Sequence, residues 1–222
     1  MQALERLFTF LLTFAALAVA VAFVHREVTE SSSTTGPGVR PPPKLVKGWQ
    51  SWTSVGRVVG NSRGPVTLLE FVDFQCPFCR SLSSNIRSAE ARRPGKVTHM
   101  VIHFPMSMHR YAYTAARLAE CAQAQGKFTE MHDLLFAKQD SIGIKSWQSY
   151  ASESGMTDSG ATARCVGDTS RVEAIEAALR AGAKARITGT PVMFINGWRF
   201  QGSMPESTLV AAIDAIADGK HP

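Results

Sequence analysis

One stretch of the sequence decides the fold: residues Val66 to Leu82 read VTLLEFVDFQCPFCRSL. Its first part, Val66 to Phe74, is almost continuously apolar and rich in β-forming residues, which predicts a central strand buried on both faces. Apolar residues between Phe78 and Ala89 then recur at spacings of four, four and three, which is typical of one face of a helix. Cys76 and Cys79 therefore stand where the strand runs into the helix.

The spacing and the place of these two cysteines suit redox chemistry. A helix brings positions three apart onto one face, close enough for a disulfide. Its first turn offers free backbone N–H groups and the positive end of the helix dipole, and both stabilise the reactive thiolate. Pro77 suits the first helical position, because it lacks a donor that the helix could not use there. We therefore expect Cys76 to be the exposed nucleophile and Cys79 to be the more buried resolving thiol.

The same cysteine spacing has two other interpretations. It can form half of a zinc site, and His99, His103 and His109 are nearby in the sequence. A structural zinc usually needs a second CxxC or a His pair at ligand spacing, whereas Cys121 and Cys165 are isolated. The other alternative is an inert structural disulfide. Redox chemistry is the favoured interpretation, and no metal site is expected.

The first 24 residues predict the compartment. Leu7 to Val24 is an uncharged apolar run of 18 residues, near the minimum length that spans a bilayer as a helix. Glu5 offsets Arg6, whereas a cleaved signal peptide usually starts with more positive charge. Ala18-Val19-Ala20 nevertheless has the form of a cleavage site, so residues 1–24 are interpreted as a transmembrane anchor, with a cleaved signal sequence as the alternative. Either way the remainder is exported, and in an oxidising compartment an even number of cysteines suggests disulfides.

Composition divides the rest into a tether and one domain. Residues 25–47 are expected to be a flexible linker, because their Ser, Thr, Gly and Pro residues cannot bury apolar surface. The domain is expected over residues 48–222, which is long enough for one well-filled core. Its later elements are predicted to be a strand at 97–104, a helical block at about 105–186, strands at 192–195 and 198–200 joined by Asn196-Gly197, and a helix from about Pro205. A right-handed crossover followed by an antiparallel hairpin gives a mixed sheet, which is the order of an α/β thioredoxin fold with an inserted helical subdomain.

Six motifs lie along this domain in a specific order. They are Glu70-Phe71, Asp73 to Cys79, Glu120-Cys121-Ala122, Gln125 to Phe128, Gly189-Thr190-Pro191 and Phe194 to Gly197. Together they resemble the DsbA-like thiol-disulfide oxidoreductases of the thioredoxin superfamily, over roughly residues 64–218. The resemblance implies dithiol/disulfide exchange at Cys76 and Cys79, with no bound metal or organic cofactor.

The resemblance also gives roles to residues outside the cysteine pair. It makes Thr190-Pro191 a cis peptide bond that faces the cysteines and can pair with an incoming peptide backbone. Without it, Pro191 is simply a proline that opens a strand. It makes Glu70 a partly buried acid that passes protons to or from Cys79. The alternative for Glu70 is a carboxylate at a strand end, bonded to backbone or paired with a lysine.

One position departs from the family pattern. Strongly oxidising members carry His between the cysteines, where this chain has Phe78, and an apolar Phe cannot stabilise the thiolate. A disulfide-forming oxidase is favoured, with a reductase or isomerase of the same fold as the alternative. Cys121 and Cys165, 44 positions apart in the helical block, are expected to form a structural disulfide worth about 4 kcal/mol, or else to be two free buried cysteines.

The expected partners follow from compartment and chemistry. They are exported proteins with cysteines, a membrane redox partner that resets the active pair, and the membrane itself through residues 7–24. The expected location is the cell envelope, with the catalytic domain outside the cytoplasm. The net charge of +6 is spread over interleaved basic and acidic residues, so nucleic-acid binding is not expected. A non-enzymatic peptide-binding module and a metal carrier are the alternatives from other classes.

Overall fold

The computed structural model describes residues 42–60 and 63–222. The expected membrane segment at residues 7–24 and most of the expected linker lie outside the described residues. Within them, no helix combines the length and the apolar character that crossing a membrane requires.

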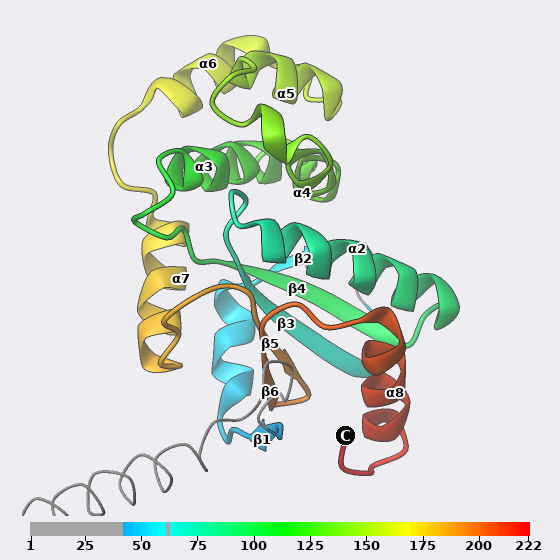
Figure 1. Ribbon diagram of the computed structural model, residues 1–222. Coiled ribbons are helices and arrows are strands. Elements are labelled where there is room, and N and C mark those ends of the chain that lie inside the picture. Colours follow the sequence, from blue (N-terminus) through cyan, green and yellow to red (C-terminus); the bar gives the residue numbers. More distant parts are fainter. Residues whose placement is uncertain (1–41, 61–62) are drawn as a thin grey trace, which may run out of the picture. The chain divides into compact units, whose positions relative to one another are not determined.

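A six-stranded mixed sheet forms the centre of the domain, with the strand order β1-β6-β5-β3-β4-β2 (Figure 1). The strands are β1 (Lys44–Leu45), β2 (Arg57–Val59), β3 (Val66–Val72), β4 (Val97–His103), β5 (Val192–Ile195) and β6 (Trp198–Gln201). Strand β3 runs parallel to β4 and antiparallel to β5, as the predicted crossover and hairpin require. The expected mixed central sheet is confirmed.

The helices and 3-10 turns alternate with these strands along the chain. They are η1 (Trp49–Val55), α2 (Pro77–Arg92), α3 (Ala112–Gln123), α4 (Phe128–Ala137), η2 (Gln139–Ser141), α5 (Trp147–Glu153), α6 (Ser159–Gly167), α7 (Glu173–Lys184) and α8 (Glu206–Ala217). Helices α2 and α8 cover one face of the sheet, while η1 and α7 cover the other (Figure 1). Helices α3 to α6 form a further layer at the end of the sheet where β3 leads into α2.

The helical block expected at about 105–186 therefore has two parts. Helices α3 to α6 pack on one another, but α7 packs against the sheet and η1. Gly182 allows this close packing, because a Cβ at that position would lie 2.4 Å from the ring of Phe104. Only α3 to α6 form the added layer.

Two short strands at the sheet edges were not predicted. In β1, Lys44 and Leu45 pair with Arg199 and Trp198, so ordered pairing begins before the expected domain start at residue 48. Strand β2 pairs with β4 over three residues. Strands of two or three residues are too short to show a period of two in the sequence.

The predicted Asn196-Gly197 turn joins β5 to β6. Asn196 and Gly197 both have positive φ values, 43° and 89°, which a tight two-residue hairpin requires. Gly197 is also needed for space, because a Cβ there would lie 2.3 Å from the indole of Trp49. The turn thus fixes the hairpin and lets η1 pack beside it.

Candidate active site

The cysteine pair lies at the start of α2, directly after the central strand. Cys76 is the N-cap residue with an extended backbone, and Pro77 is the first residue of the helix. Asp73 holds the turn between β3 and α2: its backbone oxygen accepts from the N–H of Cys76 at 3.0 Å, and its carboxylate accepts from the N–H of Gln75 at 2.7 Å. The predicted strand-to-helix junction therefore places Cys76 at the free N–H groups of the helix.

Cys76 is less accessible than expected. It exposes only 5% of its surface, so the expectation of an exposed nucleophile is wrong, although Cys79 is still more buried at 0%. The reason is the loop before β5: the Cys76 thiol donates a hydrogen bond to the carbonyl oxygen of Thr190, with sulfur and oxygen 3.3 Å apart. The structure has a cis peptide bond between Thr190 and Pro191. This loop lies beside the cysteine pair, because β5 pairs directly with β3.

The two thiols have opposite acidities. Hydrogen bonds from the Cys79 thiol, and then from Thr190 and the helix N–H groups of Cys79 and Phe78, outweigh burial and lower the pKa of Cys76 from 9.0 to about 5. Burial raises the pKa of Cys79 well above 9.0, and the hydrogen bond with Cys76 and the charge of Glu70 raise it further. Cys76 therefore reacts as a thiolate at neutral pH, while Cys79 holds its proton.

Glu70 lies fully buried in β3, rather than partly buried as expected. Its Oε2 lies 3.3 Å from Nε2 of His99, so its partner is a histidine and neither a lysine nor the backbone. Its Oε1 has no hydrogen-bond partner among the described residues. A buried carboxyl oxygen without a partner is costly, which marks this position as more than a packing site.

The three histidines considered as zinc ligands have separate partners. His99 contacts Glu70, His103 Nε2 lies 2.9 Å from Glu120, and His109 Nδ1 lies 2.7 Å from Asp73. No group of three His, Cys, Asp or Glu side chains in the described part of the chain is arranged to hold a metal ion.

Two residues of the site were not predicted from sequence. The carboxylate of Asp73 accepts from the N–H of Met106 and from His109, in addition to the N–H of Gln75 in the turn, so one buried carboxylate joins both loops beside the thiols. Gln139 donates to the carbonyl oxygens of Phe74 and Cys76, at 2.8 and 3.0 Å. Asp73 directly after a strand was a usable signal, whereas Gln139 is 63 residues from Cys76 and gave none.

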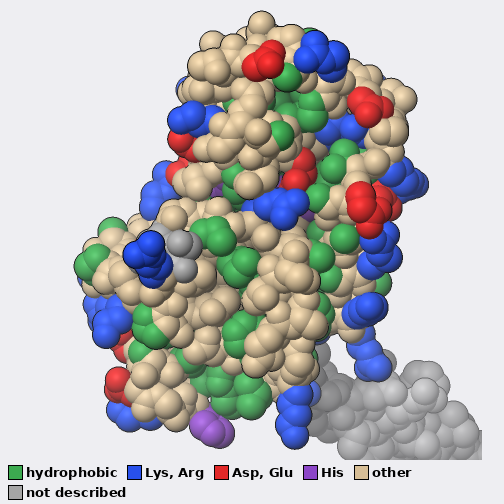
Figure 2. All heavy atoms as spheres, turned by 180° about the vertical axis from the view of Figure 1, so that it is seen from behind, with side chains coloured by type: hydrophobic (Ala, Val, Ile, Leu, Met, Phe, Trp, Pro, Cys, Tyr) green, Lys and Arg blue, Asp and Glu red, His purple; other side chains and the backbone are tan. Residues whose placement is uncertain are grey.

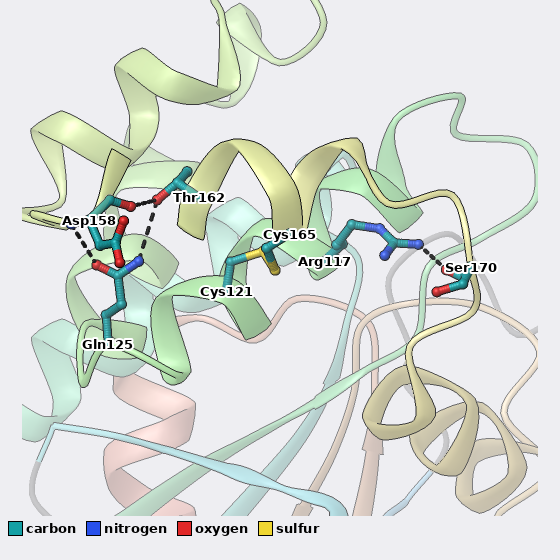
Figure 3. The surroundings of a disulfide bond; sticks show 7 residues. All are labelled: Arg117, Cys121, Gln125, Asp158, Thr162, Cys165 and Ser170. Carbon is teal, nitrogen blue, oxygen red and sulfur yellow. Dashed lines mark hydrogen bonds between the residues drawn. A yellow bond between two sulfur atoms is a disulfide. The ribbon is translucent and has the colours of Figure 1, made fainter. Parts of the chain in front are cut away.

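Cys121 in α3 and Cys165 in α6 form a disulfide, with Cα atoms 6.1 Å apart (Figure 3). Hydrogen bonds at both ends of α6 accompany it. Gln125 donates to the hydroxyl of Thr162, and buried Arg117 donates to the carbonyl oxygen of Ser170. The disulfide therefore lies between two hydrogen bonds, and all three interactions hold α6 and its ends against α3.

The residue that follows Pro77 between the two cysteines is apolar and exposed. Phe78, between the cysteines, exposes 65% of its surface. Lys and Arg side chains elsewhere are scattered and mixed with acidic ones over the face shown in Figure 2. On this face the described residues form no continuous basic patch of the kind that nucleic-acid binding needs.

The sheet order and the thiol pair at the start of α2 define the thioredoxin class of proteins. A protein-family model described as thioredoxin matches residues 53–215, so the chain belongs to that family. The thioredoxin fold expected from the motifs is confirmed.

Solved structures share this fold. Oxidised BdbD from Bacillus subtilis superposes with a TM-score of 0.66 at 19% identity, over 82% of this chain and 98% of that one. A thioredoxin-like oxidoreductase from Silicibacter pomeroyi gives 0.64 at 23% identity, over 78% and 99%. Alpha-DsbA1 from Wolbachia pipientis gives 0.61 at 20% identity, over 74% and 92%. The predicted resemblance to the DsbA-like proteins is confirmed for the fold.

The curated relatives are much longer proteins. Na(+)/H(+) antiporter NhaA 3 from Salinispora tropica is 33% identical over 157 residues, which is 70% of this chain and 24% of the antiporter. Na(+)/H(+) antiporter NhaA 1 from Mycolicibacterium gilvum is 29% identical over 170 residues, or 71% and 26%. The chain thus spans about a quarter of the length of the curated relatives it matches.

Proposed function

We propose that the protein is a thiol-disulfide oxidoreductase that forms disulfides in exported proteins. A substrate thiolate attacks the oxidised pair at the sulfur of Cys76, the bond between the two cysteines breaks, and Cys79 leaves and takes up a proton. A second substrate thiolate then attacks the substrate sulfur of the mixed disulfide and releases Cys76 as a thiolate. The substrate gains one disulfide, and the pair holds the two electrons.

The low pKa of Cys76 supports the proposed direction of electron flow, from the substrate thiols to the cysteine pair. A thiolate that is stabilised by Cys79, Thr190 and the helix N–H groups stabilises the reduced pair, and a couple with a stabilised reduced form is a strong oxidant. Phe78 takes no part in this stabilisation through its side chain, because only its backbone N–H contributes. The absence of His between the cysteines is therefore compatible with an oxidase.

The binding surface for substrate is proposed to consist of the Thr190-Pro191 loop and Phe78. The loop lies beside the sulfur that the substrate attacks, and its carbonyl oxygen is an acceptor for a peptide N–H once the Cys76 thiol no longer donates to it. Phe78 offers an apolar contact at the same place. Both features are independent of the substrate's sequence, which suits an enzyme that acts on many unfolded chains.

The proposed location is the outer side of a membrane, held there through residues 7–24, with a membrane redox partner that reoxidises the pair. The uncharged apolar run in the sequence supports this location. The matched relatives support it as well, because an ion antiporter works in a membrane. In this arrangement the domain remains close to its redox partner.

The reduction potential of the Cys76–Cys79 couple, measured against glutathione, tests the direction. We expect it to lie well above the value of about −270 mV that is typical of reducing thioredoxins. A value at or below that figure would make the protein a reductase. Oxidative refolding of a reduced substrate protein tests the activity itself, with Cys76→Ser as the control that should form no disulfides. A wild-type protein that gives no more disulfides than Cys76→Ser would rule out the proposed oxidase activity.

A further inference from the structure

A group of buried ionisable side chains lies beneath α2, between the sheet and α4. Glu70 and His99 stand on the same face of β3 and β4, because Leu68 pairs with His99 and Glu70 with Val101 in the parallel register. Nε2 of His99 faces Glu70 at 3.3 Å, and its Nδ1 faces Oε1 of Glu90 at 3.9 Å. The ring thus stands between a fully buried carboxyl group and one whose side chain is 29% exposed.

In the proposed exchange reaction, a proton must reach and leave the buried thiol of Cys79 near this group. Cys79 is fully buried and must gain one proton when the pair is reduced and lose it when the pair is reoxidised. Glu70 is close enough for its charge to raise the pKa of Cys79, and its Oε1 has no other partner among the described residues. Glu70 is itself sealed from solvent, so a proton that it accepts needs a further group to leave the core.

We propose that His99 relays this proton between Glu70 and Glu90, and that Glu90 exchanges it with solvent. The inference rests on the proposed thiol-disulfide exchange, and it adds the path by which the buried thiol is protonated and deprotonated. The gap of 3.9 Å between His99 and Glu90 is closed by a rotation of the partly exposed Glu90 side chain or by one bridging water.

The proton balance is complete over one turnover. When the pair is reoxidised, the Cys79 proton passes to Glu70, Glu70 protonates Nε2 of His99, and the ring releases its Nδ1 proton to Glu90. When substrate reduces the pair, the proton moves in the opposite direction: Glu90 protonates Nδ1, and Nε2 protonates Glu70, which protonates the leaving Cys79 thiolate. The second half-reaction restores the ring's first tautomer, so no ring flip is needed.

The groups that face His99 show whether the proton can leave through Glu90 or through His132. The charged and titratable side chains around it are Glu70 of β3, Glu90 and Arg87 of α2, and His132 and Asp133 of α4. His132 Nδ1 lies 3.0 Å from Asp133, but its Nε2 has no hydrogen-bond partner in the described part of the chain, so it is hydrogen-bonded to neither Glu70 nor His99. Burial lowers the pKa of His132, which keeps that ring neutral. Burial also raises the pKa of Glu90, which suits a group that accepts and releases protons.

The test separates the two chemical steps of reoxidation in the full-length protein. The reduced protein is mixed with excess oxidised glutathione, and samples are quenched with acid at successive times. Mass spectrometry then gives the fraction of protein with a glutathione mixed disulfide at Cys76 and the fraction with the closed Cys76–Cys79 disulfide. Attack by Cys76 needs no relay, whereas closure by Cys79 requires that thiol to lose its proton. We expect His99→Gln to leave the rate of mixed-disulfide formation unchanged and to slow closure by at least about tenfold near neutral pH. The difference in closure rate from the wild type should become smaller as pH rises.

Two further variants make the result specific. His132→Gln is the matched control, since it replaces another buried histidine of the same group, 6.0 Å away between ring centroids, and should leave both steps at the wild-type rate. Glu90→Gln, at the rim of the group, should slow closure like His99→Gln, and the double variant should be no slower than the slower single one. If His99→Gln does not fold, Glu90→Gln alone decides.

Three results would overturn the relay. One is closure at the wild-type rate in Glu90→Gln or in folded His99→Gln. Another is an equal loss in His132→Gln, which would indicate a general effect of core polarity. The third is a wild-type protein that does not react with glutathione at all, and this result alone would also remove the proposed function.

Discussion

The sulfur of Cys76 lies 3.3 Å from the carbonyl oxygen of Thr190, a residue 114 positions further along the chain. This contact joins the start of α2 to the loop before β5. It explains the low exposure of Cys76. The carbonyl oxygen itself favours the protonated thiol, whereas the side chain of the same residue lowers the pKa of Cys76. The reactivity of the thiol therefore depends on a loop that is far away in sequence.

Thr190→Val should raise the pKa of Cys76 toward its ordinary value, because the hydroxyl that stabilises the thiolate is removed while the size of the side chain is kept. The ultraviolet absorbance of the thiolate, followed against pH, measures the change. Thr190→Ser keeps the hydroxyl and should titrate like the wild type. A Thr190→Val titration curve that overlies the wild-type curve would show that the helix N–H groups and Cys79 suffice.

Alkylation should modify Cys76 first and should continue down to mildly acidic pH, because its pKa is about 5 whereas that of Cys79 is raised well above 9.0. Cys79→Ser should accumulate mixed disulfides with substrate through Cys76, since the resolving thiol is absent. Cys76→Ser should accumulate few or none. Mass mapping of the alkylated and trapped cysteines checks both statements, and faster alkylation of Cys79 would contradict the order of reactivity.

The reduced protein should become more stable as pH rises from about 5 to about 9. Over this range Cys76 is ionised in the folded state but protonated in the unfolded chain, so unfolding takes up a proton. The gain is lost as pH falls toward 5, and its slope cannot exceed about 1.4 kcal/mol per pH unit. Above about pH 9 the trend reverses, because Cys79 ionises more readily in the unfolded chain than in the folded protein.

Urea unfolding of the selectively reduced protein at several pH values measures this dependence. Cys76→Ser is the control and should show a smaller rise between about pH 5 and pH 9, because it lacks the contribution of Cys76. Equal slopes in the two proteins would mean that Cys76 is not ionised in the folded state.

The double variant Cys121→Ser/Cys165→Ser should lose about 4 kcal/mol of unfolding free energy, which is the chain-entropy estimate for a disulfide that spans 44 residues. Thermal or urea unfolding of the oxidised proteins gives the difference. The active-site reaction should continue in the variant while it is folded, because Cys76 and Cys79 are outside this link. Mild reduction should open the Cys76–Cys79 pair before Cys121–Cys165, since the low pKa of Cys76 stabilises the reduced form of that pair.

The sequence predicted the central elements of the site because their signals are local. The apolar run before Cys76 and the period of the following helix placed the thiols at a strand-to-helix junction, and the N-cap position of Cys76 followed from Pro77. The Asn196-Gly197 turn gave the hairpin for the same reason. These elements depend on residues within a few positions of one another.

What could not be predicted depends on contacts between distant residues. The burial of Cys76 comes from Thr190, and the partner of Glu70 comes from the neighbouring strand, where His99 gave no signal apart from a possible zinc ligand. Strand β1 exists because two residues happen to reach the edge of β6. Propensity and periodicity describe single elements, so they do not contain this information.

The link between Cys121 and Cys165 closes residues 121–165 into a covalent ring that includes α4, η2 and α5. A protease that cuts one peptide bond inside this ring produces two polypeptides that are still one molecule. Helices α3 and α6 therefore stay attached on either side of the nick. The layer above the active site can lose the continuity of its backbone without losing a fragment, and the nick becomes visible in a gel only after reduction.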